Sequence, residues 1–217
     1  GLVNAGIMNL SQAVGVIMGA NIGTTMTAQV IAFKFTNIVP YAIIIGAILV
    51  LFSSKKSRKH LGELIIGFGI LFMGMNMMSD AMKPLKDIPE FSQFMIGLED
   101  NPLLGVLSGL LLTAVVQSSS ATIGILQVLA MQGLVPIEAA LPILFGDNIG
   151  TCATALIASI GTSLTAKRAA IMHVTIKIIG TIIFMFILHP VTSLVAMTAS
   201  DPARQIANAH TFFNIAN

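Results

Sequence analysis

The chain has little charge of either sign and a single cysteine. Of its 217 residues, 11 are Lys or Arg and 9 are Asp or Glu, so charged residues make up 9% of the chain, against roughly a quarter in a soluble globular domain. So few charges cannot cover a water-facing surface, which argues against a soluble enzyme. The net charge of +2 is too small to indicate nucleic-acid binding, and no basic stripe with interleaved aromatic residues is present. Cys152 alone excludes a disulfide within the chain.

Apolar residues dominate the sequence instead. They make up 55% of the chain, and the mean hydropathy is +0.92. A spanning helix needs about 20 mostly apolar residues, and several charge-free windows reach that length. These windows cover residues 1–33, 35–54, 64–79, 101–137, 148–166 and 178–200. The pattern predicts an all-α, polytopic membrane protein.

The apolar stretches also predict the individual helices. The expected ranges are 11–33, 37–54, 61–79, 102–116, 121–134, 138–161 and 169–188, followed by a mixed apolar and polar segment at 191–217. Glycine weakens a helix and permits an unwound turn. We therefore expect discontinuous helices, with breaks near Asn21-Ile22-Gly23 and near Asn148-Ile149-Gly150.

Basic residues in short loops give the expected orientation, because such loops stay in the cytoplasm. One cytoplasmic loop is marked by Lys55, Lys56, Arg58 and Lys59, and another by Lys167 and Arg168. The charged stretch 80–101 is expected to be external. The single crossing at 138–161 then returns the chain to the cytoplasm only if residues 102–134 enter and leave on the same side. This predicts a re-entrant hairpin with Gln117 to Ser120 at its tip.

The sequence contains an internal repeat. At an offset of 127 positions (148 − 21), residues 6–31 match residues 133–158 without a gap, and both copies contain the run Asn-Ile-Gly-Thr. The expected orientations place the copies in opposite senses, which is typical of secondary transporters. The counterpart of the tip would lie upstream of Gly1, so the chain is expected to lack the first half of its first repeat.

The repeat divides the chain into three expected parts. Residues 1–54 are the remainder of the first inverted repeat. Residues 55–101 are a connecting loop, a helix and an external loop. Residues 102–217 are the second inverted repeat, which contains both the tip and the second Asn-Ile-Gly-Thr run.

The tip, Gln117-Ser118-Ser119-Ser120, places polar side chains in the middle of a charge-free window. Part of this polarity can cap the two hairpin helices, but polar clusters inside a membrane usually mark a site. Hydroxyls, an amide and helix N-terminal N–H groups donate hydrogen bonds to an oxyanion. The hydroxyl and amide oxygens are also suitable ligands for sodium. Without Arg or His in the tip, a bound dianion needs cations and helix dipoles to offset its charge.

The two Asn-Ile-Gly-Thr runs are a second candidate. Each is either a ligand site on an unwound turn or a glycine–threonine seam for helix packing. Asp147 precedes the second run and is the only carboxylate deep in an expected span. It can ligate a cation, carry a proton or pair locally in a water-filled cavity. Lys177 can face a cavity or extend its head from a tilted helix, and His173 and His210 are expected to be hydrogen-bonded interior residues.

The motifs resemble those of a known family. Gln117-Ser118-Ser119-Ser120-Ala121-Thr122, followed 31 positions after Gln117 (148 − 117) by Asn148-Ile149-Gly150-Thr151, is similar to the second repeat of the type II sodium–phosphate cotransporters. The run from Gly19 to Thr25 resembles the end of that family's first repeat. The resemblance implies a sodium-driven importer of inorganic phosphate with two inverted repeats. It also implies a multi-pass protein of the plasma membrane, which is the inner membrane for a bacterial member.

The resemblance and the polar clusters together define the expected site residues. For phosphate they are Gln117, Ser118, Ser119, Ser120, Asn21 and Asn148. For sodium they are Gln117, Ser119, Thr24, Thr25, Asp147, Asn148 and Thr151. Three positions depart from the family. Asp147 and Cys152 stand where the family often has small or hydroxyl residues, and Lys177 replaces the Asn of its His-x-x-Phe-Asn element.

The expected function is sodium-coupled import of inorganic phosphate by alternating access. No nucleophile–base set, phosphate-binding loop or metal-ligand spacing occurs in the sequence, so neither an enzyme nor a cofactor beyond sodium is expected. Expected partners are phosphate, sodium ions and the lipid bilayer, with a homodimer left open and no nucleic acid. Two alternatives remain: an ion-coupled importer of another small anion such as a carboxylate, and a membrane component that senses phosphate without transporting it.

Overall fold

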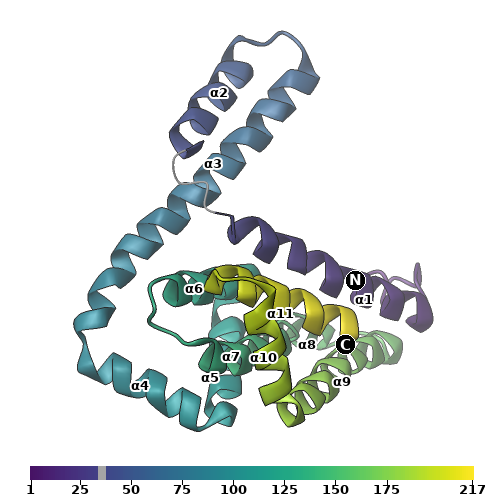
Figure 1. The fold of residues 1–217 in the computed structure, drawn as a ribbon. Coiled ribbons are helices and arrows are strands. Elements are labelled where there is room, and N and C mark those ends of the chain that lie inside the picture. Colours follow the sequence, from purple (N-terminus) through teal and green to yellow (C-terminus); the bar gives the residue numbers. More distant parts are fainter. Residues whose placement is uncertain (34–37) are drawn as a thin grey trace. The chain divides into compact units, whose positions relative to one another are not determined.

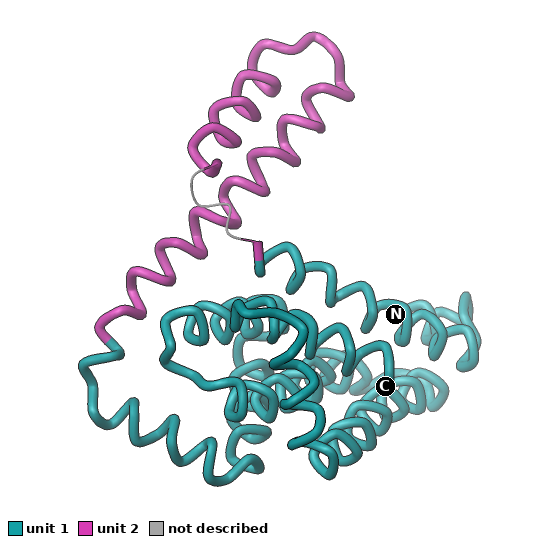
Figure 2. The backbone as a smooth tube through the Cα atoms, viewed as in Figure 1, with its two compact units in different colours: residues 1–32, 85–217 teal, residues 33–84 magenta. Residues whose placement is uncertain are grey.

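The computed structural model describes residues 1–33 and 38–217, and every regular element in these ranges is a helix. The expected all-α class is therefore confirmed. The chain divides into two compact units, residues 1–32 with 85–217 and residues 33–84 (Figure 1 and Figure 2).

The larger unit is a bundle of helices of different lengths. They are α1 (Leu10–Ile31), α4 (Pro89–Asp100), α5 (Pro102–Val116), α6 (Ser119–Met131), α7 (Ile137–Gly150), α8 (Ala153–Ser159), α9 (Leu164–Phe186), α10 (Leu188–Thr198) and α11 (Pro202–Ala216). Three segments are long and apolar enough to cross a membrane, namely α1, α9 and the combined α7 and α8. The pair of α4 and α5 is bent by 115°, as in a broken span or a re-entrant segment. The chain is thus an integral membrane protein.

The smaller unit consists of α2 (Val39–Phe52) and α3 (Lys56–Met82), and a short 3-10 helix, η2 (Lys83–Asp87), follows α3. Glycine brings the two helices together. A Cβ on Gly46 would lie 2.8 Å from the carbonyl oxygen of Gly62, and a Cβ on Gly62 would lie 2.7 Å from that of Gly46. Small residues permit this approach in a membrane. Together with η2, α3 forms a further candidate span.

Three loop predictions are wrong. Lys167 and Arg168, expected in a loop, lie near the start of α9. α3 begins at Lys56, so the basic cluster forms its first turns instead of a loop, because Lys and Arg are good helix formers. The stretch 80–101, expected to be a loop, contains η2 and α4. α4 has one apolar face, where Met95 and Leu98 are buried, while its acidic residues are exposed. Position 37, where a helix was expected to begin, lies outside the described residues.

The two Asn-Ile-Gly-Thr runs differ in backbone structure. The second run is broken as predicted, since α7 ends at Gly150 and α8 begins at Ala153. The first run is not broken, and α1 continues through Asn21 and Gly23 to Ile31. One glycine in a helix costs only about 1 kcal/mol relative to alanine. That cost is too small to interrupt a helix unless other contacts favour the break.

Glycines also bring the backbones of α5 and α7 into contact. A Cβ on Gly109 would collide with the carbonyl group of Ile143, and a Cβ on Gly146 would collide with that of Val106. Gly150 adds to this seam, because its Cβ would lie 2.7 Å from the Leu110 carbonyl oxygen. Residues four apart share a helix face, so the second run is part of a packing seam. In α1, a Cβ added to Gly15, Gly19 or Gly23 would meet no atom within 4 Å.

An aromatic cluster joins α7, α9 and α11 in the core. The ring of Phe145 lies 5.5 Å from that of Phe184 and 5.1 Å from that of Phe213, measured between centroids. Phe184 and Phe213 are 4.9 Å apart in an edge-on arrangement. Such pairs add to the stabilisation from burial alone. The cluster fixes the three helices whose polar residues are described below.

The internal repeat is visible in the backbone. Gly6 and Gly133, which align at the offset of 127, have φ angles of +72° and +71°. The same two hydrogen bonds close both turns, Gly6 to Val3 with Ile7 to Leu2, and Gly133 to Ala130 with Leu134 to Leu129. The helices that follow begin at Leu10 and Ile137, again 127 apart. Residues 1–7 therefore have the backbone cap that ends α6. The opposite membrane sense of the copies stays a prediction.

Candidate functional site

The chain breaks between α5 and α6 at the predicted tip. Gln117 ends α5 in the left-handed conformation, with φ 56° and ψ 28°, and no other non-glycine residue in the described ranges has a positive φ. This conformation costs an L residue about 1–2 kcal/mol. Ser118 then caps α6, because its hydroxyl accepts the Ala121 N–H at 3.3 Å. One of the three serines therefore has the capping role that was considered for the tip.

The tip borders a small polar pocket. Its lining consists of Gln117, Ser118, Ser119, Ser120, Gly150, Thr151 and Thr154. The structure thus brings the whole predicted tip together with Thr151 of the second run. The pocket volume is about 190 Å³, below the roughly 300–1,000 Å³ of sites for drug-sized ligands. Every residue in the lining is uncharged, so the pocket suits a small polar ligand.

Hydrogen-bond donors at the tip are available. Within the described ranges, no hydrogen bond engages the hydroxyl of Ser119 or Ser120, or the side-chain amide of Gln117. The N–H groups of Ser119 and Ser120 lie in the first turn of α6, where a helix provides no acceptor for them. The N-terminal end of a helix also carries partial positive charge. These groups together form the kind of site that binds an oxyanion.

Asp147 lies in the interior between α5, α6 and α7. The Thr113 hydroxyl donates to its Oδ1 at 2.6 Å, and the Thr122 hydroxyl lies 3.1 Å from that of Thr113. Asp147 is fully buried, and its Oδ2 has no hydrogen-bond partner among the described residues. A buried carboxylate oxygen of this kind requires a cation or a proton. The predicted sodium role of Asp147 remains a prediction, because no ligand tests it.

Asn148 contacts a lysine instead of the tip pocket. Lys177 Nζ donates to Asn148 Oδ1 at 3.0 Å and to Asn214 Oδ1 at 2.6 Å. All three residues are buried, with Lys177 only 1% exposed. Lys177 therefore neither faces an open cavity nor extends to the membrane surface. The predicted phosphate and sodium roles of Asn148 also remain predictions.

The first run lies on α1 and outside the lining of the tip pocket. Asn21 and Thr24 are half-buried. Thr25 is buried, and its hydroxyl donates to the Ile22 carbonyl of its own helix at 2.7 Å. These three residues are not in the pocket lining with Gln117 and the serines. Their predicted binding roles remain predictions.

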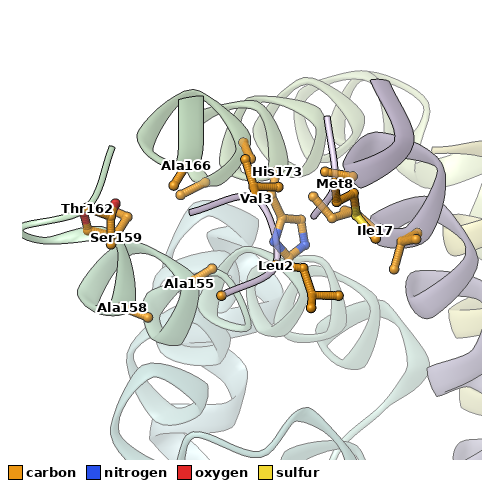
Figure 3. Close-up of a pocket in the computed structure, with 15 residues that line it drawn as sticks. Leu2, Val3, Met8, Ile17, Ala155, Ala158, Ser159, Thr162, Ala166 and His173 are labelled. Atoms are coloured by element: carbon orange, nitrogen blue, oxygen red, sulfur yellow. Dashed lines mark hydrogen bonds between the residues drawn. The ribbon is translucent and has the colours of Figure 1, made fainter. Parts of the chain in front are cut away.

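A second pocket lies between the N-terminal segment, α1, α8 and α9, with a volume of about 330 Å³ (Figure 3). Apolar side chains such as Leu2 and Ile17 form most of its wall, and Ser159 and Thr162 lie at one end. The His173 ring forms part of the wall, and its Nε2 has no hydrogen-bond partner among the described residues. Both ring nitrogens of His210 are also without one there. The expectation of fully hydrogen-bonded histidines is therefore wrong, and the apolar wall does not suit phosphate.

Sequence reasoning did not identify three residues of these polar clusters. Thr113 precedes Gln117 by one helical turn and so shares its face, which is a signal that could have identified it. Asn214 lies 37 positions from Lys177, and no local sequence signal indicates their contact. Thr154 follows Thr151 by three positions and lines the same pocket.

The fold and the pocket together define a polytopic membrane protein with a small pocket lined by uncharged residues. Residues 1–80 and 73–213 match the family model described as Na+/Pi-cotransporter. The chain belongs to the Na+/Pi-cotransporter family, a family of transporters and not of enzymes. The resemblance noted from the motifs is thereby confirmed.

Named relatives cover different parts of the chain. The uncharacterized protein YqeW of Bacillus subtilis is 32% identical over 99% of this chain and 70% of its own length. YjbB of Salmonella typhimurium, named as a candidate inorganic phosphate export protein, is 23% identical over 96% of the chain, which spans 38% of YjbB. Sodium-dependent phosphate transport protein 2A of Rattus norvegicus is 43% identical over 25% of the chain and 8% of its own length. No solved structure matches.

Proposed function

We propose that this protein imports inorganic phosphate together with sodium ions, and that phosphate binds in the tip pocket. The pocket itself is the observation that carries the proposal. The hydroxyls of Ser118, Ser119 and Ser120, the Gln117 amide and the first N–H groups of α6 meet in one small space. Several hydrogen bonds to an anion, together with the positive end of a helix, form a phosphate site without a basic side chain.

Sodium provides the missing positive charge in this proposal. The pocket lining contains no Lys, Arg or His, so no lining side chain neutralises the phosphate. The side-chain oxygens of Gln117, Ser119 and Thr151 lie in the same lining and are of the type that binds a hard cation. We infer that Thr24, Thr25, Asp147 and Asn148 complete the sodium sites, with Asn21 joining the phosphate ligands. Each ion then binds better when the other is present, which is the basis of coupling.

Transport would proceed by alternating access between the two repeats. The proposed repeats are residues 1–54 and 102–217, joined by residues 55–101. The matching backbone caps at Gly6 and Gly133 support this division. We place the protein in the plasma membrane, which is the inner membrane in a bacterium.

Export is a second candidate, supported by the name of YjbB, which matches 96% of the chain. A coupled carrier moves its substrate in the direction set by the ion gradients, so one site can serve either direction. Reversing the sodium gradient in vesicles of known orientation separates the two. Flux that requires inward sodium supports import, and outward flux without sodium supports export.

The proposed site is tested by uptake of radiolabelled phosphate into proteoliposomes containing the full-length protein. Ser119→Ala and Ser118→Ala should lower sodium-dependent uptake by roughly tenfold or more, because a lost hydrogen bond to a charged group is worth about 1.5–3 kcal/mol. Ser108→Ala is the matched control, since Ser108 lies on α5 in the lining of another pocket. Unchanged uptake in both tip variants would rule out phosphate binding at this tip.

Competition identifies the transported anion. Arsenate should compete with phosphate, whereas sulfate and dicarboxylates should not. Strong competition by a dicarboxylate would indicate a carrier of another small anion. Tight phosphate binding without net flux would indicate a sensor.

A further inference from the structure

The Lys177 ammonium group is enclosed by the protein and held by two neutral oxygens. Its Nζ is 3.0 Å from Asn148 Oδ1 on α7 and 2.6 Å from Asn214 Oδ1 on α11. The Phe213 ring centroid lies 5.7 Å from the same nitrogen. α9, which carries Lys177, is a candidate membrane span, where an ionisable side chain is costly and usually functional.

Both amides are held in place by their own helices. The Asn148 Nδ2 donates to the Leu144 carbonyl at 3.0 Å, and the Asn214 Nδ2 donates to the His210 carbonyl at 3.0 Å. Because each NH2 group is engaged, each Oδ1 must point toward the ammonium group. Two preset oxygens from two helices therefore converge on one cation. Amide oxygens are also the ligands that hard cations such as sodium take from proteins.

A carboxylate supplies the compensating charge. Asp147 adjoins Asn148 in the sequence, and it is near enough to Lys177 for their opposite charges to attract without a direct ion pair. Its Oδ2 has no hydrogen-bond partner among the described residues, and the residue is fully buried. A buried carboxylate without a cation nearby would cost several kcal/mol. Cys152, His173 and His210 are the other titratable groups whose electrostatic environment includes Lys177.

We propose that Asn148 and Asn214, with Asp147 as a nearby counter-charge, form a monovalent-cation site in which the ammonium group of Lys177 takes the place of a sodium ion. The cation of this site is covalently attached to the chain, so the site contributes no transported ion. The inference rests on the proposed sodium coupling and revises one part of it, because Asp147 and Asn148, assigned above to the sodium sites, would here serve a cation that does not leave.

Removing the ammonium group should open the site to sodium. Lys177→Ala leaves the ligands and creates space, and Lys177→Ser does so while adding a hydroxyl. Lys177→Met keeps the volume filled, and the double variant Lys177→Ala/Asp147→Asn removes the compensating charge. The measurement is thermal unfolding of the detergent-purified full-length protein in phosphate-free buffer, in sodium chloride or choline chloride at equal concentration.

The expected result is a sodium-specific rise in melting temperature in Lys177→Ala or Lys177→Ser beyond that of the wild type. The rise should reach about 5–10 °C at a sodium concentration about 100 times the dissociation constant. The Lys177→Met and double variants should show no such gain. A variant that folds only in sodium chloride also supports the proposal.

The proposal is overturned if neither the alanine nor the serine variant gains sodium-specific stability, including the case in which neither folds in sodium chloride. An equal gain in the double variant also overturns it. Because the measurement involves neither phosphate nor flux, its outcome is independent of the phosphate-uptake test. In proteoliposomes, the alanine variant should in addition carry one more sodium ion per phosphate than the wild type.

Discussion

The Thr113 hydroxyl donates to Asp147 Oδ1 across 2.6 Å, and this hydrogen bond links α5 to α7 inside the bundle. Both side chains are fully buried. Thr113 lies one turn before the tip, and Asp147 lies one turn before Thr151. The bond therefore ties the two segments that line the tip pocket to each other.

We expect Thr113→Val to destabilise the protein by about 1–3 kcal/mol, because a buried carboxylate would lose its hydrogen bond while shape is conserved. Thr113→Ser keeps the hydroxyl and should retain most of the stability. Thermal unfolding in detergent measures the difference. Equal stability of the valine and serine variants would show that the hydrogen bond contributes nothing.

The glycine seam predicts a second stability effect. Gly146→Ala should cost about 1–3 kcal/mol or prevent folding, because the added Cβ collides with the Val106 carbonyl group of α5. The matched control is Gly97→Ala on α4, where an added Cβ meets no atom within 4 Å. This control should be neutral or gain up to about 1 kcal/mol from helix propensity. Comparable melting temperatures for the two variants would contradict the close contact of α5 and α7.

The left-handed conformation of Gln117 predicts that a substitution at this position can raise the stability of the protein while lowering phosphate uptake. Gln117→Gly removes the backbone strain and the amide together, so it should gain about 1 kcal/mol of stability while sodium-dependent phosphate uptake falls. Gln117→Ala keeps the strain and should be less stable than the glycine variant. Melting temperature and uptake are measured on the same preparations. An uptake equal to that of the wild type in both variants would remove Gln117 from the proposed phosphate ligands.

Long apolar windows made most helices of the larger unit predictable. α4 was not predicted because its charged residues interrupt the apolar pattern. The buried residues on its apolar face are Met95 and Leu98. The two Asn-Ile-Gly-Thr runs show the limit of local sequence. Almost the same residues form a continuous helix in α1 and a break after α7. The difference is tertiary, because a Cβ added to Gly150 would meet the α5 backbone, while one added to Gly23 would meet no atom of the described residues within 4 Å.

The tip pocket was predictable because its residues are close in sequence or belong to a repeated motif. Gln117 to Ser120 are contiguous, and Thr151 belongs to the run next to Asp147. The lysine cluster was not predictable in the same way. Lys177 lies 29 positions from Asn148 and 37 from Asn214, and only the packing of α7, α9 and α11 brings them together.

The glycine stripe of α1 has one more consequence. Gly15, Gly19 and Gly23 align with Pro142, Gly146 and Gly150 of α7. A Cβ added to either α7 glycine would meet the α5 backbone, whereas one added to any of the three α1 glycines would meet no described atom within 4 Å. A surface without side chains cannot recognise a neighbour through charge or interlocking shape. A helix with small residues at matching intervals can instead pack closely against this stripe and displace lipid from it.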